Sequence, residues 1–148
     1  MHRPGNRPPP PPSVQNISPA LAPHRAPATV TGMNSADRYH IARFDEIEPA
    51  RCPCGWSRRA FAGIPGAPAS VHFVDIEEDS RAHYHKQMTE FYVILEGEGH
   101  LELDGAMVPV APGTTIMIRP GCRHRAVGKL KILNVPVPAF DPADEWFD

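Results

Sequence analysis

Short apolar runs separated by Gly, Pro and Asp make up the chain from residue 39 onward, and no stretch has a helical period. Runs spaced by about 8 to 12 residues are typical of β-sandwiches and barrels. Asp104-Gly105 supplies the positive φ of a tight hairpin turn, and Pro112-Gly113 and Pro120-Gly121 favour further turns. We therefore predict an all-β sandwich or barrel. The predicted strands cover residues 39–44, 58–62, 70–76, 82–85, 90–95, 100–103, 107–110, 114–118, 123–127 and 131–135.

The first quarter of the chain differs in composition from the rest. Nine of the 19 prolines precede Met33, and no acidic residue occurs before Asp37. Such a segment cannot bury enough apolar area to offset its ordering entropy. We predict a disordered Pro-rich tail over residues 1–36 and one barrel domain over 37–148. The tail is either solvated chain, a ligand for proline-binding grooves, or sequence upstream of a true start at Met33.

Charge and cysteine content exclude several classes of protein. With 15 Lys and Arg against 17 Asp and Glu, the net charge is −2, so nucleic acid and anionic membranes are not expected partners. No window contains roughly 18 apolar residues, and a secretory signal is not evident. Three cysteines do not form a disulfide framework and suit a reducing compartment. We expect a cytoplasmic protein that acts on a small molecule.

Three histidines and one glutamate form the main candidate for a functional site. His83 and His85 are two residues apart in a predicted strand, so their imidazoles leave the same face. Glu90 begins the next strand, and His124 follows on a distant one. Three imidazoles and a carboxylate suit Fe, Mn, Ni, Co, Cu or Zn. The alternative is that these histidines are ordinary surface residues on an edge strand.

Two motifs around these residues resemble those of the cupin superfamily. His83-Tyr-His85 with Glu90 and Gly97 is similar to the first cupin motif, and the stretch from Gly113 to His124 is similar to the second. The resemblance implies a small single-domain, cupin_2-like protein with an antiparallel jelly-roll barrel, commonly a homodimer. It also implies a divalent metal (Fe, Mn, Ni or Zn) inside the barrel, held by four ligands: His83, His85, Glu90 and His124.

Two further residues are candidates for catalysis. Tyr92 shares the strand parity of Glu90 and should point into the barrel, where its phenol could orient a substrate oxygen or transfer a proton; it could equally be a core aromatic. Arg119 stands where the second motif usually has proline. Glu77 and Gly128 are two further departures from the motifs. A guanidinium at the pocket mouth could hold a carboxylate or phosphate, or it could simply face solvent.

The cupin resemblance does not name a reaction, because one fold carries many activities. We predict a metal-dependent enzyme acting on a small oxygenated substrate, with dioxygenase chemistry favoured over isomerisation or decarboxylation. A non-catalytic metal or ligand binder is the competing hypothesis.

Two other segments are interpreted as structural. Cys52-Pro-Cys54 lacks a second ligand pair at zinc-ribbon spacing and is interpreted as an ordered loop that packs at the barrel mouth, with a redox or covalent role as the alternative. At the C-terminus, Asp141 can cap a short turn, and Trp146 and Phe147 can cover a sheet edge. No site chemistry is expected in this C-terminal segment.

Overall fold

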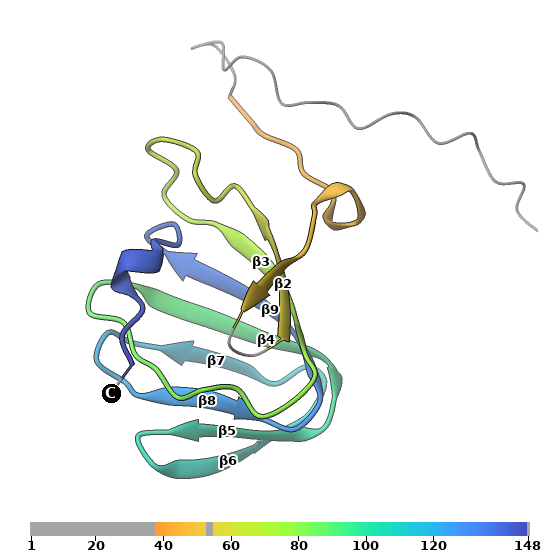
Figure 1. Cartoon of the computed structure of the whole chain (residues 1–148), viewed down its shortest axis with the longest axis vertical. Coiled ribbons are helices and arrows are strands. Elements are labelled where there is room, and N and C mark those ends of the chain that lie inside the picture. The colour runs from red at the N-terminus through yellow and green to blue at the C-terminus, as the bar shows by residue number, and fades with distance from the viewer. Residues whose placement is uncertain (1–37, 53–54, 148) are drawn as a thin grey trace, which may run out of the picture. The chain divides into compact units, whose positions relative to one another are not determined.

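The computed structural model describes residues 38–52 and 55–147, so the predicted tail over 1–36 and Cys54 lie outside the described residues. Two short 3-10 helices, η1 (Phe44–Glu46) and η2 (Pro142–Asp144), flank a set of antiparallel strands in the described part (Figure 1). The strands are β1 (Ala50–Cys52), β2 (Gly55–Ala60), β3 (Val71–Ile76), β4 (Thr89–Gly97), β5 (Gly99–Leu103), β6 (Ala106–Val110), β7 (Thr115–Ile118), β8 (His124–Val127) and β9 (Leu130–Val137). No described helix is long and apolar enough to cross a bilayer.

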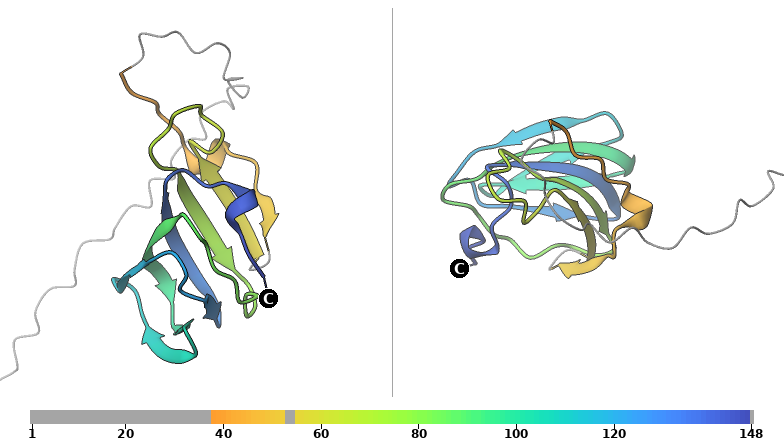
Figure 2. Two further views of the ribbon diagram at one scale, coloured as in Figure 1. Left: turned by 90° about the vertical axis from the view of Figure 1, so that its left-hand side faces the viewer. Right: turned by 90° about the horizontal axis from the view of Figure 1, so that it is seen from above.

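The strands form two antiparallel sheets. The larger sheet has the order β1-β2-β3-β9-β4-β7, and the smaller has the order β6-β5-β8. Strands that are distant in sequence pair at the centre, where β9 lies between β3 and β4. Figure 2 shows the two sheets from two further directions. This all-β antiparallel arrangement confirms the predicted fold class.

The apolar core lies between the two sheets and draws on both. In the larger sheet the inward positions of β3, β4 and β9 supply Val74, Ile94 and Ile132, while Leu101 and Ala126 come from β5 and β8. Alternate residues of a strand point to opposite faces, and β3 and β9 both show the alternating burial that this predicts. Burial of these side chains is the main source of stability for such a fold.

Two turns depend on backbone that only certain residues adopt. Asp104 and Gly105 have φ of 48° and 84° and join β5 to β6, which confirms the predicted hairpin. Gly97 ends β4 at φ +87°, and a Cβ there would lie 2.2 Å from the carbonyl oxygen of Lys129. Glycine is therefore required at the position that closes the first cupin-like motif.

Two predicted strands are wrong and one strand was missed. Residues 39–43 are irregular and lead into η1, and Tyr39 and Ile41 are 75% and 73% exposed because no neighbouring strand pairs with them. Residues 82–85 form only isolated bridges, one through His83 and one through Tyr84. The unpredicted strand β1 is three residues long and has no apolar alternation to reveal it.

Candidate metal centre

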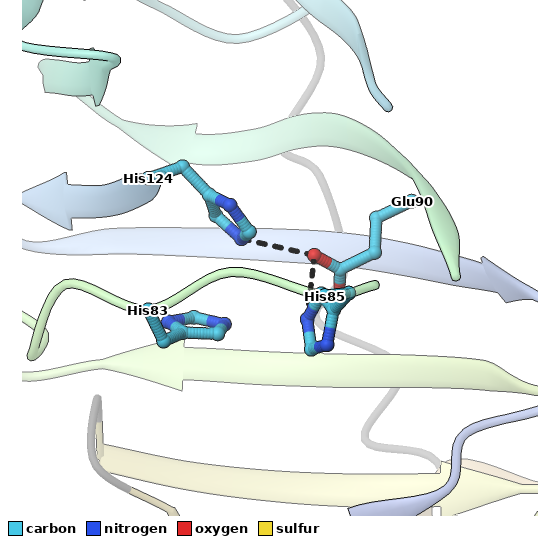
Figure 3. Close-up of side chains that lie close together, drawn as sticks. All are labelled: His83, His85, Glu90 and His124. Carbon is cyan, nitrogen blue, oxygen red and sulfur yellow. Dashed lines mark ion pairs between the residues drawn. The ribbon is translucent and has the colours of Figure 1, made fainter. Parts of the chain in front are cut away.

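The four predicted ligands come from three separate segments and meet inside the barrel (Figure 3). Glu90 is the second residue of β4, and His124 is the first residue of β8. His83 and His85 lie on the segment between β3 and β4, which is fixed by reciprocal backbone hydrogen bonds of 3.0 and 2.8 Å between His83 and His124. The structure therefore brings together all four side chains, hereafter the His–Glu cluster.

The ligand atoms of the His–Glu cluster converge without satisfying one another. Glu90 Oε2 lies 3.0 Å from His124 Nε2 and 3.3 Å from His85 Nε2. These three atoms are buried, and none has a hydrogen-bond partner of acceptable geometry in the described structure. Buried polar atoms without partners cost free energy, so the arrangement calls for a further group that all of them can contact.

The opposite nitrogen of each imidazole is already hydrogen-bonded to a backbone carbonyl. His83 Nδ1 lies 3.2 Å from the oxygen of Arg81, His85 Nδ1 lies 2.7 Å from that of Asp144, and His124 Nδ1 lies 3.0 Å from that of Cys122. A carbonyl only accepts, so each Nδ1 donates, and in the neutral form of each imidazole the lone pair is on Nε2, which faces the interior. This orientation of ligand histidines is the usual one at protein metal sites.

The spacing of the His–Glu cluster fits one metal ion. Its four ligand atoms all lie within 4.8 Å of one another, close to the separation expected around an ion with bonds of about 2.0–2.2 Å. Donors of this kind suit a divalent transition metal with positions left for substrate or water. The donor set, the tautomers and the unpaired buried atoms agree, so the residues present fit the predicted metal.

The electrostatics of the His–Glu cluster favour an ionised Glu90 and a neutral His83, whereas Glu90 and Asp144 raise the pKa of His85 against the effect of burial, so a metal ion bound there must displace a proton from His85. Burial alone would raise the pKa of Glu90, but the imidazoles of His124 and His85 hold it well below its usual range. Burial lowers the pKa of His83 to about 4, with His124 beside it acting in the same direction. The carboxylate is therefore ionised and the His83 imidazole neutral at neutral pH, as metal ligation requires.

The C-terminal segment contributes to the site, contrary to the expectation that it carries no site chemistry. Asp141 caps η2 as predicted, but the next carboxylate along, Asp144, is 5% exposed and accepts backbone hydrogen bonds of 2.9–3.0 Å from residues 86, 87 and 88. Together with the His85–Asp144 contact, these bonds fix the ligand-bearing segment. No local signal marks this role, because the partners are more than fifty residues apart.

Glu145 is a second C-terminal residue at the site that sequence reasoning missed. Its Oε1 lies 3.8 Å from His83 Nε2, and the residue lines the cavity next to the His–Glu cluster. Burial raises the pKa of Glu145 above its usual value. It is therefore a second carboxyl group beside the cluster, in an environment unlike that of Glu90.

The two predicted catalytic residues lie in different places. Tyr92 lines the cavity, and its ring centroid is 6.0 Å from that of His124. Arg119 is exposed and does not line this cavity in the described structure. Catalytic roles for both residues stay predictions, and only Tyr92 lies where it can contact a substrate near the cluster.

The cavity also contains side chains that were not predicted to belong to the site. The space in and in front of the cavity, open solvent included, is about 630 Å³. Arg59, His72 and Asn134 line it from β2, β3 and β9. Cys52, the last residue of β1, also lines the cavity.

The fold and the site together define a β-barrel with a candidate metal centre in its interior. A family profile for the cupin domain matches residues 71–135. A protein from Planctomyces limnophilus of known structure is 42% identical, with a TM-score of 0.71, and the match covers 76% of this chain and 100% of that one. The chain belongs to the cupin superfamily, which confirms the resemblance of its two motifs.

More distant structures share the fold. The nucleoside dehydratase Pac13 from Streptomyces is 20% identical with a TM-score of 0.64, over 73% of this chain and 89% of that one. Ectoine synthase from P. lautus is 19% identical with a TM-score of 0.63, over 73% of this chain and 88% of that one. At these identities the likeness concerns the fold alone. None of the curated proteins compared with this chain matches it significantly.

Proposed function

We propose that this cupin is a metal-dependent enzyme that binds one divalent transition metal at the His–Glu cluster and acts on a small oxygenated substrate. The observation that carries the proposal is the convergence of buried, unpaired ligand atoms from His85, Glu90 and His124. When bound, the metal would polarise a substrate oxygen or activate dioxygen. Fe, Mn, Ni and Zn are the candidate ions for this ligand set.

The residues around the His–Glu cluster have distinct tasks in this proposal. Tyr92 orients a substrate oxygen or carries a proton. Glu145, whose pKa is raised by burial, can hold a proton beside His83. The Asp144 carboxylate and carbonyl hold the His85 segment in place. The walls exclude bulk water from a buried carboxylate, which strengthens the electrostatic interactions inside.

Two reaction classes are compatible with this arrangement. Oxygenase chemistry is our first candidate, because a partly open site of imidazoles and one carboxylate suits iron and dioxygen. A redox-neutral isomerisation or decarboxylation is the second, and it is favoured by a phenol and a second carboxyl group near the cluster, Tyr92 and Glu145, which can move protons. A binder without turnover is the remaining alternative.

Metal analysis tests the proposal directly. Protein purified without chelators should contain close to one ion per chain by plasma mass spectrometry. After chelation, titration with Fe(II), Mn(II), Ni(II) and Zn(II) should show that His85→Ala and His124→Ala each weaken metal affinity by at least about 100-fold, because each removes a ligand. His100→Ala is the matched control, because His100 is exposed on β5. Unchanged metal content in both His83→Ala and His85→Ala would contradict the ligand assignment.

Turnover assays separate the reaction classes. The metal-loaded protein should be tested against diols, enediols and oxo-acids, with oxygen uptake measured in air and product measured under argon. Turnover that requires air supports an oxygenase, and turnover under argon supports a redox-neutral reaction. Saturable binding with no product in either condition indicates a binder.

We also propose that the protein is a cytoplasmic homodimer. The outer face of the larger sheet supports association between copies, because Phe91, Met117 and Val137 are 38%, 50% and 39% exposed there. Exposed apolar side chains that gather on one face are typical of an interface. Light scattering on protein eluted from a size-exclusion column should give twice the mass of one chain. The mass of a monomer at all concentrations would rule out the homodimer.

A further inference from the structure

One row of polar side chains crosses the inner face of the larger sheet. Register pairs join Arg59 of β2 to His72 of β3, His72 to Asn134 of β9, and Asn134 to Tyr92 of β4. All four line the same cavity. We call Arg59, His72, Asn134 and Tyr92 the polar row. With neighbouring strands about 4.8 Å apart, it spans about 14 Å.

The polar row begins beside the His–Glu cluster and ends at Arg59. Tyr92 lies two residues after Glu90 on the same strand, and Asn134 Nδ2 donates a 2.6 Å hydrogen bond to Glu90 Oε1. Arg59 lies at the far end, three strands away from Tyr92. A molecule lying along the row can therefore reach the cluster at one end and a guanidinium at the other.

The Arg59 guanidinium is held in position but has no ion-pair partner among the described residues. Its Cζ lies over the Phe140 ring, 4.4 Å from the ring centroid, and its Nε donates to Ser57 Oγ at 3.4 Å. Among the described residues its two terminal nitrogens make no hydrogen bond. Glu145 acts on Arg59 electrostatically, but the ion pair within reach of Glu145 is with His83.

Asn134 gives a second, independent sign of a ligand. The residue is 7% exposed, and its Oδ1 is buried with no hydrogen-bond donor within reach in the described structure. Its Nδ2 is already used by Glu90. An unpaired amide oxygen in a cavity wall costs free energy unless a ligand or a water donates to it.

We propose, building on the proposed function, that the polar row is the substrate-binding strip and that the substrate carries an oxyanion group, a carboxylate or a phosphate, which Arg59 binds. A guanidinium presents two parallel N–H groups that match both anions. In this pose a hydroxyl of the substrate donates to Asn134 Oδ1. The substrate class is thus a small hydroxylated acid or phosphate ester.

Anion binding by metal-free protein tests this assignment separately from the metal. Chelator-treated protein is titrated with succinate and with inorganic phosphate, and the Arg59 Nε–Hε resonance is followed by NMR. Arg59→Gln should weaken binding about tenfold or more, because a charged hydrogen-bonding pair is lost. Arg59→Lys, which keeps the charge without the fork, should fall between. Arg58→Gln is the matched control, since Arg58 is adjacent on β2 but does not line the cavity.

Each outcome has a definite meaning. A preference for succinate or for phosphate identifies the acid group. Equal binding by wild type, Arg59→Gln and Arg58→Gln, or no saturable binding at millimolar concentrations, would overturn the strip while leaving the metal proposal intact. Arg59-dependent anion binding in a protein that takes up no metal would support the strip and refute the metal-dependent enzyme. Circular dichroism confirms that each variant is folded.

Discussion

Neighbouring rows of the larger sheet have opposite chemistry although the same four strands carry them. A second row lies two residues away from the polar row on each strand. We call it the core row, and its members are Ser57, Val74, Ile132 and Ile94. Its members are 1–9% exposed, and three of the four are apolar. The two rows share the same strands, the same register and the same inner face of the sheet. The fold itself therefore does not require polar side chains in the polar row.

The difference between the rows indicates which part of the interior serves folding and which serves binding. The three apolar members of the core row join Leu101 and Ala126 of the smaller sheet in one apolar cluster, against which Tyr92 of the polar row packs. The polar row instead contains an unpaired amide oxygen and an arginine without an ion pair among the described residues. A buried polar atom without a partner, such as Asn134 Oδ1, reduces stability by about 1–3 kcal/mol. A ligand that donates a hydrogen bond to Asn134 Oδ1 and pairs with the Arg59 guanidinium would explain why both groups are present.

Truncating a side chain of the core row should have the largest effect on stability. Ile132 is 1% exposed at its centre, and Ile132→Ala should lower the free energy of unfolding by about 2–5 kcal/mol, because a cavity remains. Urea denaturation of the metal-free protein measures this. Metal binding per folded molecule should not change.

A surface methionine provides the control for this substitution. Met107 is 49% exposed on β6, and Met107→Ala should change stability by less than about 0.5 kcal/mol. Equal losses from the two substitutions would mean that the core row is not the centre of the core.

The His–Glu cluster could be predicted because its signals are local. The pairs and spacings around His83, His85 and Glu90 lie within one short stretch, and His124 follows a turn that Pro120-Gly121 marks. Strand alternation was enough to place Tyr92 on the same side as Glu90. The apolar runs and the Asp104-Gly105 turn were likewise enough for most of the strands.

The polar row could not be predicted, because it depends on pairings between distant strands. Arg59 reaches it only through the register of β2 with β3, and Asn134 only through the insertion of β9 between β3 and β4. The strand that carries His72 is apolar on both parities, so its pattern does not select a face. Asp144 is bound to a segment 56–58 residues away, a separation that no spacing rule covers.

Removing the carboxylate that supports the His85 segment should have the next largest effect. Asp144→Ala leaves the backbone N–H groups of residues 86–88 without their acceptor, so we expect a loss of about 2–3 kcal/mol in unfolding free energy. Metal affinity should fall about 10- to 100-fold, as when other supports of a ligand histidine are removed. Calorimetric metal titration and urea denaturation measure the two effects.

Asp141→Ala serves as the control for Asp144→Ala. It removes only the cap of η2, a 2.9 Å bond to the backbone of Ala143, and should leave metal affinity unchanged. Unchanged metal affinity in Asp144→Ala as well would mean that the C-terminal segment stabilises the barrel without orienting its ligand.

The polar row should also make stability depend on pH. Burial, with Arg59 acting in the same direction and Glu90 opposing them, lowers the pKa of His72 to about 4. Because the folded pKa lies below the unfolded value of 6.5, the contribution of His72 is complete above pH 6.5 and is lost as pH falls from 6.5 toward 4. In metal-free protein the loss from this residue should reach about 2 kcal/mol at pH 5.

Comparison with His72→Gln isolates this effect, because the His–Glu cluster is the same in both proteins. The variant should lose less stability than wild type between pH 7 and pH 5. Identical profiles of stability against pH for the two proteins would show that His72 is not held neutral by its surroundings. They would also contradict the electrostatic interaction between Arg59 and His72.

Among the substitutions in the two rows and their supports, Arg59→Met should have the smallest effect on stability, and it is the sharpest test of the contrast between the rows. Methionine keeps an apolar stem against Phe140, and the charge it removes has no ion pair among the described residues, so unfolding free energy should change by less than about 1 kcal/mol. Oxyanion binding should nevertheless be lost, and the pKa of His72 should rise because a neighbouring positive charge is gone. Loss of more than about 2 kcal/mol would place Arg59 among the residues that hold the barrel together, because a side chain whose only task is binding contributes little to folding.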